Sequence, residues 1–313
     1  GHMTDNTPTR LWPATKHATS FGIGVPVAQS TPGADWPHFA DQVAIARNAR
    51  DAGIDSLWFA DHFSFPSDAG PRGSWDVFTL MAAIAASVPD VTVGPMVACT
   101  GYRNPGVIAK SAEMIQDISG GRFILGLGAG WQKDEYDQFG LPFEPRVTRF
   151  EEALTIIHGL LKDGKIDFQG TYSQANSAVN LPRAASGPET PILVGSTGDR
   201  MLGLLAKYGD AWNTGWGADT DGLKAKAAKL DAACNAIGRD PHSVVRTVTI
   251  AVAADGFAGD PKSVLQGSTA EKVAFLKEIE GLGFSHLIVR LDPLSAGTIA
   301  AFAPVIAAFH AAG

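Results

Sequence analysis

The 313-residue sequence predicts an α/β fold, a single closed (β/α)8 barrel, and three observations lead to this prediction. Short apolar runs alternate strictly with helical patterns along the chain, which is typical of a parallel sheet covered by helices. The length suits one such barrel, because these domains have about 250 residues or more. Apolar residues make up 45% of the chain and charged residues 18%, so a sizeable core can form and disorder is not expected.

The first half of the chain contains four strand-helix pairs. Each expected strand is a short apolar run, and each expected helix places apolar residues such as Phe39 and Val43 on one stripe. The third helix is closed by Gly120 and Gly121, a common way for a helix to end. The expected strands are 21–25, 54–59, 91–98 and 123–127, and the expected helices are 36–52, 75–87, 105–118 and 146–161.

The second half continues the alternation after one irregularity. About 28 residues, 163–190, separate the fourth helix from the next strand, whereas an ordinary helix-to-strand link has about 2–6 residues. We therefore predict an insertion with a small hairpin at 167–172. Since no linker divides the chain, residues 21–313 are predicted to form one TIM-barrel domain. The later expected strands are 191–194, 210–213, 243–253 and 285–291, and the later helices are 199–208, 219–237, 270–281 and 296–310.

Charge and residue patterns exclude several classes of function. A net charge of −7 without a cluster of Lys and Arg argues against nucleic acid as a partner. No apolar run approaches the roughly 18 residues of a membrane-spanning helix, so no membrane contact is expected. The histidines are scattered without zinc-like spacing, so no metal site is predicted. The Gly-x-Ser-x-Gly pattern of one hydrolase class is absent.

The amino terminus and the cysteines give expectations about processing and location. Gly1, His2 and Met3 look like a cloning remnant, and the polar stretch 1–20 is predicted to be loose and to lack a secretory signal. The two cysteines are far apart in sequence and cannot form a disulfide framework. We therefore expect a protein of the reducing cytoplasm.

The stretch 122–136 contains three alternating glycines where the fourth strand ends. Gly126, Gly128 and Gly130 let a flat ligand or another backbone come close, because no side chain stands in the way. The stretch is not a dinucleotide fingerprint, since Trp131 takes the place of the last glycine of G-x-G-x-x-G. The aromatic and acidic residues that follow would give a ligand something to contact.

Asp61 and His62 follow the second strand, at the barrel end where such folds place their chemistry. A histidine there can donate a hydrogen bond to a bound ring or take part in proton transfer, because its ordinary pKa lies near neutrality. The structural alternative is an Asp-His pair that fixes a loop. Trp212, Asn213 and Arg290 also lie at predicted strand ends, where they either line the pocket or support the structure.

Pro95 lies inside the third apolar run and predicts an irregular strand, because proline cannot donate a ladder hydrogen bond. The irregularity is either a bulge under a flat cofactor or a kink that closes the barrel. Thr100, just beyond it, can form a hydrogen bond with a ligand edge. We interpret the adjacent Cys99 as a small packing residue and not as a nucleophile.

The predicted phosphate site follows the fifth strand. Gly195, Ser196, Thr197 and Gly198 open a helix, so free backbone amides, two hydroxyls and the positive end of the helix dipole meet there. The alternative is a plain helix N-cap by one of the two hydroxyl residues. Asp199 beside the site is compatible with a single phosphate monoester.

Several specific motifs occur together between residues 21 and 213. They are Tyr102-Arg103-Asn104-Pro105, Ala109-Lys110, Asp117-Ile118-Ser119-Gly120-Gly121-Arg122, Gly126-Leu127-Gly128-Ala129-Gly130-Trp131, Glu135-Tyr136, Phe139-Gly140, Arg149-Phe150-Glu151-Glu152-Ala153-Leu154, Pro191-Ile192-Leu193-Val194-Gly195 and Asp210-Ala211-Trp212-Asn213. On these motifs the sequence resembles the luciferase-like monooxygenase superfamily, and within it the coenzyme F-420-dependent oxidoreductase group. Beyond residue 213 only the rhythm of the barrel continues.

The resemblance implies a TIM barrel that binds flavin mononucleotide (FMN) or the deazaflavin coenzyme F-420 at the carboxyl face of its strands. The phosphate would bind at residues 195–198, and the insertion 163–190 would lie over the barrel mouth. The ring would lie against the third strand. The family often has a non-prolyl cis peptide there, which in this chain would be near Met96 and Val97.

The resemblance also assigns site residues. His62 matches a histidine beside the reactive ring in many deazaflavin-using members and is the expected catalytic residue. Trp131 stands where deazaflavin-dependent sugar-phosphate dehydrogenases carry a catalytic glutamate, so that activity is not expected. The expected cofactor-binding residues are Asp61, Met96, Val97, Thr100, Gly128, Ala129, Gly130, Trp131, Glu135, Tyr136, Gly195, Ser196, Thr197 and Gly198.

The function that the resemblance implies is an oxidoreductase that transfers a hydride between coenzyme F-420 and a small organic substrate. The alternative enzyme is an FMN-dependent two-component monooxygenase, which uses O2 and reduced flavin from a separate reductase. A third alternative is a non-catalytic flavin-binding protein, against which His62 argues. The expected partners are a small-molecule substrate, a separate flavin or deazaflavin reductase and a second copy in a homodimer. No motif identifies the substrate.

Overall fold

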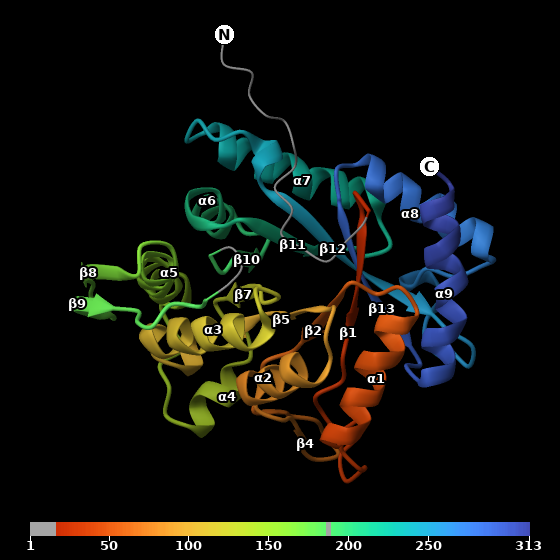
Figure 1. Cartoon of the computed structure of the whole chain (residues 1–313), viewed down its shortest axis with the longest axis horizontal. Helices are drawn as coiled ribbons and strands as arrows, with labels where there is room; N and C mark the ends of the chain where they lie inside the picture. The colour runs from red at the N-terminus through yellow and green to blue at the C-terminus, as the bar shows by residue number, and fades with distance from the viewer. Residues whose placement is uncertain (1–16, 186–188) are drawn as a thin grey trace.

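The computed structural model describes residues 17–185 and 189–313, in which parallel strands form a barrel with helices around it (Figure 1). This confirms the predicted fold. Within these residues, nine parallel strands pair in the order β5-β2-β1-β13-β12-β11-β10-β7-β6. They are β1 (Ser20–Gly24), β2 (Ser56–Phe59), β5 (Thr92–Pro95), β6 (Ala98–Cys99), β7 (Leu125–Gly128), β10 (Ile192–Gly195), β11 (Ala211–Gly215), β12 (Val245–Ala253) and β13 (His286–Asp292).

The barrel closes at its third strand, which is split into β5 and β6. Strand β5 pairs with β2 and β6 pairs with β7. An isolated bridge between Val93 and Phe123 joins β5 to the segment just before β7. The irregularity predicted from Pro95 is confirmed, because the strand is interrupted at Met96 and Val97, and the peptide bond between these two residues is cis.

Helices follow the barrel strands, and their starting residues depend on local caps. The first begins at Phe39 and not at residue 36, with His38 as its N-cap. The second begins after Asp76, whose carboxylate accepts a hydrogen bond from the Thr79 amide. The helices are α1 (Phe39–Asp51), α2 (Val77–Ser87), α3 (Pro105–Ser119), α4 (Lys133–Gln138), α5 (Arg146–Lys162), α6 (Asp199–Tyr208), α7 (Thr220–Asn235), α8 (Thr269–Gly281) and α9 (Ala296–Ala311), with 3-10 turns η1 (Thr100–Tyr102), η2 (Pro241–Ser243) and η3 (Pro261–Ser263).

The insertion contains a longer hairpin than the predicted 167–172. Strands β8 (Lys165–Gln169) and β9 (Gln174–Val179) form an antiparallel pair beside α5, at the left of Figure 1. The turn is held by the buried Glu152 carboxylate, which accepts hydrogen bonds from the amides of residues 171–173 at 2.6 to 2.9 Å. Two short elements were not predicted, namely α4 and the antiparallel pair β3 (Ser64–Phe65) and β4 (Arg72–Gly73). Both follow barrel strands, β7 and β2.

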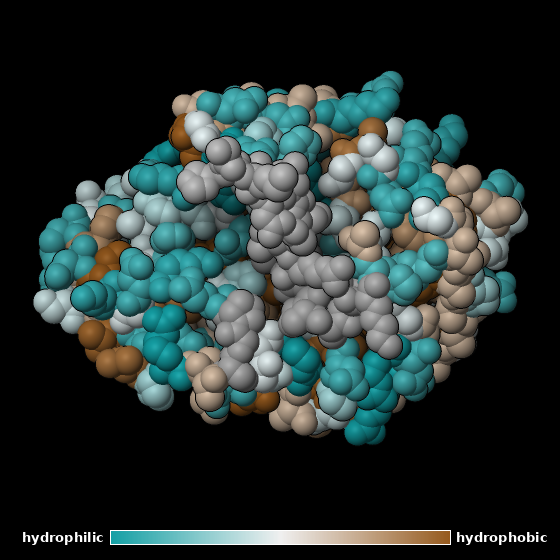
Figure 2. Space-filling view, turned by 45° about the horizontal axis from the view of Figure 1, so that its top comes forward, coloured by the Kyte–Doolittle hydropathy of each residue, from teal (hydrophilic) through white to brown (hydrophobic). Residues whose placement is uncertain are grey.

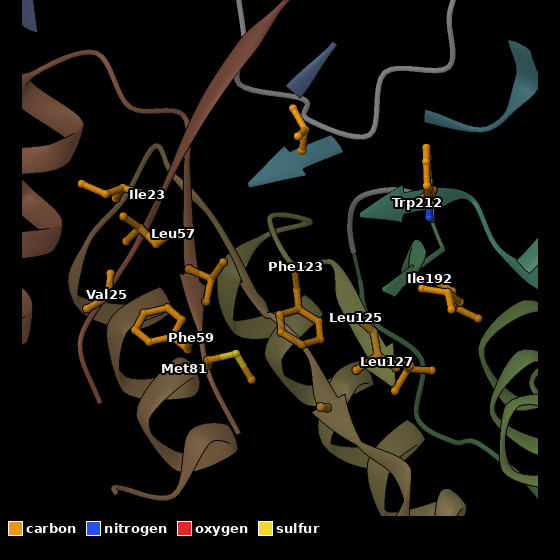
Figure 3. Packing of buried hydrophobic residues seen from close by; sticks show 14 of the residues in the cluster. Ile23, Val25, Leu57, Phe59, Met81, Phe123, Leu125, Leu127, Ile192 and Trp212 are labelled. Carbon is orange, nitrogen blue, oxygen red and sulfur yellow. The ribbon is translucent and has the colours of Figure 1, made fainter. Parts of the chain in front are cut away.

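Apolar side chains form two separate clusters, one on each side of the barrel wall. Leu57 and Phe59 of β2 belong to the larger cluster, which also contains Met81 of α2 (Figure 3). Trp58, between them, belongs to a smaller cluster with Ile288, with Ile124 just before β7, and with residues of β10 and β11. Since successive residues of a strand point to opposite faces, the larger cluster joins strands to helices and the smaller one fills the barrel interior.

The amino-terminal end of the barrel interior is polar. Its centre is His286 at the start of β13, whose ring nitrogens contact the hydroxyls of Ser20 at 2.5 Å and Ser56 at 2.7 Å. The Trp58 indole donates to the same Ser56 hydroxyl at 2.7 Å. Burial lowers the pKa of His286 to about 3, so the ring is neutral near pH 7.

The predicted loose segment 1–20 lies mostly outside the described residues, which begin at residue 17. The prediction is wrong for the end of this segment, because Thr19 and Ser20 are buried and Ser20 begins β1. Apolar side chains on the face seen in Figure 2 are scattered among hydrophilic ones, an ordinary pattern for a protein surface. In the described part of the chain, no helix combines the length and the apolar character needed to cross a membrane.

Candidate active site at the barrel mouth

A cavity of about 320 Å³ lies at the carboxyl ends of the barrel strands β5, β10 and β11. Met96 and Val97, which were predicted to contact the ring, line this cavity. The residues after β10, which were predicted to bind the phosphate, line it as well. It also takes in residues 213–215 at the end of β11 and Lys226 of α7. The lining residues that the sequence predicted are Met96, Val97, Gly195, Ser196, Thr197 and Asn213.

The loop after β10 leaves an open cradle at the start of α6. The helix N-cap is Gly198, and no side chain caps the first turn, so the predicted alternative of a cap by Ser196 or Thr197 is wrong. A β-carbon placed on Gly198 would have no atom of residues 17–185 or 189–313 within 4 Å. The loop is fixed to β11, because the Trp212 indole donates a hydrogen bond to the Ser196 carbonyl at 2.7 Å. Amides of an uncapped first turn and the helix dipole favour an anion here.

The charge beside this cradle comes from Lys226, which the sequence analysis did not identify. Its ammonium donates to the Gly215 carbonyl at 3.1 Å on the cavity wall. Arg200, although closer in sequence, points away and bonds Glu151 at 2.7 Å. No motif marks Lys226, because it lies in the middle of α7 and reaches the cavity only through the packing of that helix.

A second cavity, of about 340 Å³, lies on the other side of Met96, at the ends of β1, β2, β12 and β13. Met96 lines both cavities, so they adjoin across the mouth. The walls of the second one are mainly apolar, and its one charged lining residue within the described chain is Arg290. Its main apolar lining residues are Val25, Trp58, Met96, Ile288, Leu291 and Leu294.

The imidazole of His62, just beyond β2, is within hydrogen-bonding distance of the carboxylate of Glu135 in α4. The distance from its Nδ1 to Glu135 Oε1 is 2.7 Å, and the imidazole packs 4.3 Å from the Phe65 ring and 5.7 Å from the Trp131 ring. A carboxylate acceptor at Nδ1 favours the tautomer with the proton on that atom, which leaves Nε2 with a lone pair. Since His62 remains partly exposed while Glu135 is fully buried, Nε2 is the atom available for chemistry.

Glu135 joins three elements at one carboxylate. Besides His62 it accepts hydrogen bonds from the Phe63 amide and from the Tyr102 hydroxyl, the latter at 2.7 Å. Burial, followed by the hydrogen bond to Glu135, raises the pKa of Tyr102 above its ordinary value, so the phenol stays a donor. Glu135 was predicted to contact the cofactor, and in the structure its buried carboxylate contacts the imidazole and fixes the orientation of the ring.

Asp61 bonds Arg103 while His62 contacts Glu135, so the structural alternative of an Asp-His pair is wrong. Its carboxylate accepts two hydrogen bonds from the Arg103 guanidinium, at 2.7 and 2.9 Å, and one from the Cys99 amide at 2.8 Å. This fork holds the end of β6 against the end of β2. Burial raises the pKa of the Cys99 thiol to about 11, which agrees with the interpretation of Cys99 as a packing residue.

The alternating glycines let neighbouring parts of the protein come close, a backbone at Gly126 and side chains at Gly128 and Gly130. A β-carbon at Gly126 would lie 2.1 Å from the Pro95 carbonyl oxygen, and one at Gly128 would lie 2.5 Å from a methyl group of Val97. At Gly130, φ is 84° and a β-carbon would lie 2.1 Å from the Tyr136 hydroxyl. The space beside all three glycines is therefore filled by protein, which leaves the open cradle at Gly198 as the better place for a ligand.

Of the other predicted residues near this stretch, Tyr136 and Thr100 are buried and Trp131 is exposed. The Tyr136 hydroxyl is buried and donates to the Ala129 carbonyl at 3.1 Å. The Thr100 hydroxyl donates to the Gly128 carbonyl at 3.4 Å and does not face open space. Trp131 is 66% exposed and stands beside His62 at the mouth. Among the residues that the structure describes, no group of His, Cys, Asp or Glu is arranged to hold a metal ion.

These features fit a flat cofactor that carries a phosphate. An uncapped helix start and Lys226 would hold the phosphate, and the apolar side chains of Met96 and Val97 would support a ring. The space available to a ligand continues from one cavity into the other, because Met96 lines both cavities.

Comparison with known proteins identifies a matching family and similar enzymes. A family model described as luciferase-like monooxygenase matches residues 17–256. The chain is 28% identical over 258 residues to pyrimidine monooxygenase RutA of Allorhizobium ampelinum, covering 77% of this chain and 69% of that protein. It is 27% identical over 221 residues to 5,10-methylenetetrahydromethanopterin reductase of Methanolobus tindarius, covering 71% of this chain and 64% of that protein.

A solved structure supports the fold. The structure of an F420-dependent secondary alcohol dehydrogenase in complex with an F420-acetone adduct is similar with a TM-score of 0.79, over 93% of this chain and 99% of the other. The two sequences are 20% identical, so this similarity concerns the barrel and not the reaction.

Proposed function

This chain belongs to the luciferase-like monooxygenase family, and we propose that it transfers a hydride between coenzyme F-420 and a small organic substrate. The observation that carries the proposal is the His62–Glu135 contact of 2.7 Å, between segments that follow the carboxyl ends of β2 and β7. A histidine held by a buried carboxylate is suited to proton transfer coupled to oxidation or reduction of a substrate. One relative named above, a 5,10-methylenetetrahydromethanopterin reductase, supports an oxidoreductase of this type.

The cofactor would be held by the first cavity. Its phosphate would accept hydrogen bonds from backbone amides at the uncapped start of α6 and from the hydroxyls of Ser196 and Thr197, with Lys226 supplying the opposite charge. Its ring would rest on the apolar surface of Met96 and Val97. When bound, the deazaflavin would supply or accept the hydride.

His62 would move the accompanying proton. A carbon that carries a hydroxyl group loses a proton from oxygen when it loses a hydride, and Nε2 of His62 is the atom that would accept it. Glu135 would stabilise the imidazolium that results and would keep the ring from turning away. In the reverse direction the same nitrogen would donate the proton.

The second candidate is an FMN-dependent two-component monooxygenase. The pyrimidine monooxygenase relative favours it, and a phosphate cradle serves FMN as well as coenzyme F-420. In that case O2 would be a co-substrate, and a separate reductase would supply reduced flavin.

A titration of the pure protein with each cofactor separates the two candidates. Binding of coenzyme F-420 is followed by quenching of deazaflavin fluorescence, and binding of FMN by quenching of flavin fluorescence. We expect tight binding of coenzyme F-420, and the first candidate fails if FMN alone binds tightly. Oxygen uptake with reduced FMN and candidate substrates then tests the monooxygenase directly.

We also propose that the protein works as a homodimer. Val107 and Met114 of α3 are 55% and 58% exposed, and their spacing puts them on one face of the helix. Light scattering on the pure chain should give the mass of two copies, and Met114→Lys should shift it to one. A monomer in the unsubstituted protein would contradict this proposal. The expected cytoplasmic location stays a prediction.

A further inference from the structure

The second mouth cavity combines an apolar wall with one cation. Besides its apolar side chains it is lined by Thr249 and Arg290. The Thr249 hydroxyl is already used, since it donates to the Asn213 side-chain oxygen at 3.3 Å. Arg290 therefore supplies the charge of this cavity, on which any polar contact with a small ligand would depend.

Arg290 has no carboxylate partner in residues 17–185 and 189–313. The nearest acid along its strand, Asp292, forms no ion pair with it, although other arginines of the mouth such as Arg103 are paired. The stem of Arg290 lies over Gly24, where its Cγ would be 4.0 Å from a β-carbon. Arg290 is thus an exposed residue that lines the cavity and has no acidic partner among these residues, so its charge is available to an anionic ligand.

A cofactor phosphate does not account for this cation. The phosphate cradle lies in the other cavity and has its own cation, Lys226, whereas Arg290 is at the end of β13 on the far side of Met96. The walls around Arg290 are apolar, so the ligand that fits combines an apolar body with one anionic end. A guanidinium recognises a carboxylate with two parallel hydrogen bonds.

We propose that the second cavity binds the carboxylate of an organic acid, with Arg290 as the residue that selects the acid over its neutral analogues. This substrate class rests on the proposed function, in which this cavity is the substrate side of the site. The cavity of about 340 Å³ is at the small end of ligand pockets, so the acid is a small one.

The experiment uses two matched pairs of probes, benzoate with benzamide and hexanoate with hexanamide, in calorimetric titrations of the full chain. Each titration is done with the cofactor-free protein and with the protein saturated with the cofactor that it binds. The variants are Arg290→Gln, Arg290→Lys and, as a control in the neighbouring cavity, Lys226→Gln.

A charged hydrogen-bonding pair predicts that at least one acid binds about tenfold to a hundredfold more tightly than its amide. Arg290→Gln should remove this preference while the affinity for the amide stays unchanged, and Arg290→Lys should keep part of it. Lys226→Gln should keep the full preference. The affinity of Arg290→Gln for the cofactor should equal that of the unsubstituted protein.

Three results would overturn the proposal. The first is equal affinity for acid and amide, or no binding of either acid; the second is a preference that survives in Arg290→Gln. The third is weaker cofactor binding by Arg290→Gln, which would assign Arg290 to the cofactor. Failure of the proposed function would appear elsewhere, as a protein that binds neither coenzyme F-420 nor FMN while the acid preference in the cofactor-free titration remains measurable.

Discussion

At the scale of single residues, the contact between His62 and Glu135 is the feature with the clearest chemical consequence. The sequence predicted His62 from its place after the second strand, but it did not predict the pairing. Glu135 is 73 residues further on and meets His62 only because the loop after β7 folds back as the short helix α4. Six helical residues are too few to show a periodic pattern, so the sequence signal for this partner is absent.

We predict that His62→Ala lowers turnover about a hundredfold or more, the usual contribution of a general acid or base, and changes cofactor affinity little. The loss of deazaflavin absorbance during turnover measures the first quantity, and fluorescence titration measures the second. Unchanged turnover would remove His62 from the mechanism.

Glu135→Gln tests whether Glu135 acts by positioning. The variant keeps the shape but loses the charge that favours a proton on Nδ1 of His62. We expect the nitrogen NMR signals of His62 to report a changed tautomer ratio and the pH profile of turnover to shift. A purely structural Glu135 would leave both unchanged once folding is controlled by circular dichroism.

His286 gives a prediction about pH and stability. Its folded pKa is lowered to about 3 from 6.5 by burial, so below pH 6.5 the unfolded chain binds a proton that the folded chain does not. The free energy of unfolding should therefore fall by about 2 kcal/mol between pH 7 and pH 5 because of this residue alone. Urea unfolding at both pH values should show a smaller fall in His286→Gln, with the exposed His242→Gln as the control. Equal falls in all three proteins would contradict the assignment.

At the scale of elements, the barrel rhythm was predictable and the short additions were not. Each of the eight expected strands is present, since an apolar run bounded by turns is a strong signal for a buried parallel strand. The pairs β3–β4 and β8–β9 depend on turns and on single contacts such as Glu152, which periodicity does not detect.

Substitution of a glycine in β7 tests how the third and fourth strands pack against each other. Gly126→Ala places a methyl group 2.1 Å from the Pro95 carbonyl, a backbone atom that cannot turn aside. We expect a loss of about 1–3 kcal/mol in the free energy of unfolding, as for other overpacked sites. Gly198→Ala is the matched control, because Gly198 has an ordinary φ of −70° and open space around it. Comparable stability of both variants in urea would contradict this account of β7.

The cradle before α6 tests where the phosphate binds. Replacing Ser196 and Thr197 together with Ala and Val removes two hydroxyl donors, and Lys226→Gln removes the charge. We expect each change to weaken cofactor binding about tenfold, the effect of losing one charged or two neutral hydrogen bonds. Arg200→Gln, which alters a cation that points toward Glu151, is the control. If the control alone bound the cofactor more weakly, the phosphate would have to bind elsewhere than at this cradle.

At the scale of the whole molecule, the two ends of the barrel differ in their roles. The amino-terminal end carries the buried network of Ser20, Ser56 and His286, which contributes to stability. The carboxyl end carries the two cavities, the His62–Glu135 contact and Arg290, which has no acidic partner in the described part of the chain. The sequence predicted which end holds the chemistry because that follows from the fold. It did not predict Lys226 or the division into two cavities, which depend on how helices and loops pack around the mouth.

The central claim is that the chain binds a phosphate-bearing deazaflavin at residues 195–198. The most direct test compares the dissociation constants of coenzyme F-420 and of the same deazaflavin without its phosphate-bearing tail, by fluorescence titration of the pure protein. Charged hydrogen bonds to the cradle and Lys226 predict that coenzyme F-420 binds at least about tenfold more tightly. Equal dissociation constants for the two compounds, or no binding of either, would contradict the account.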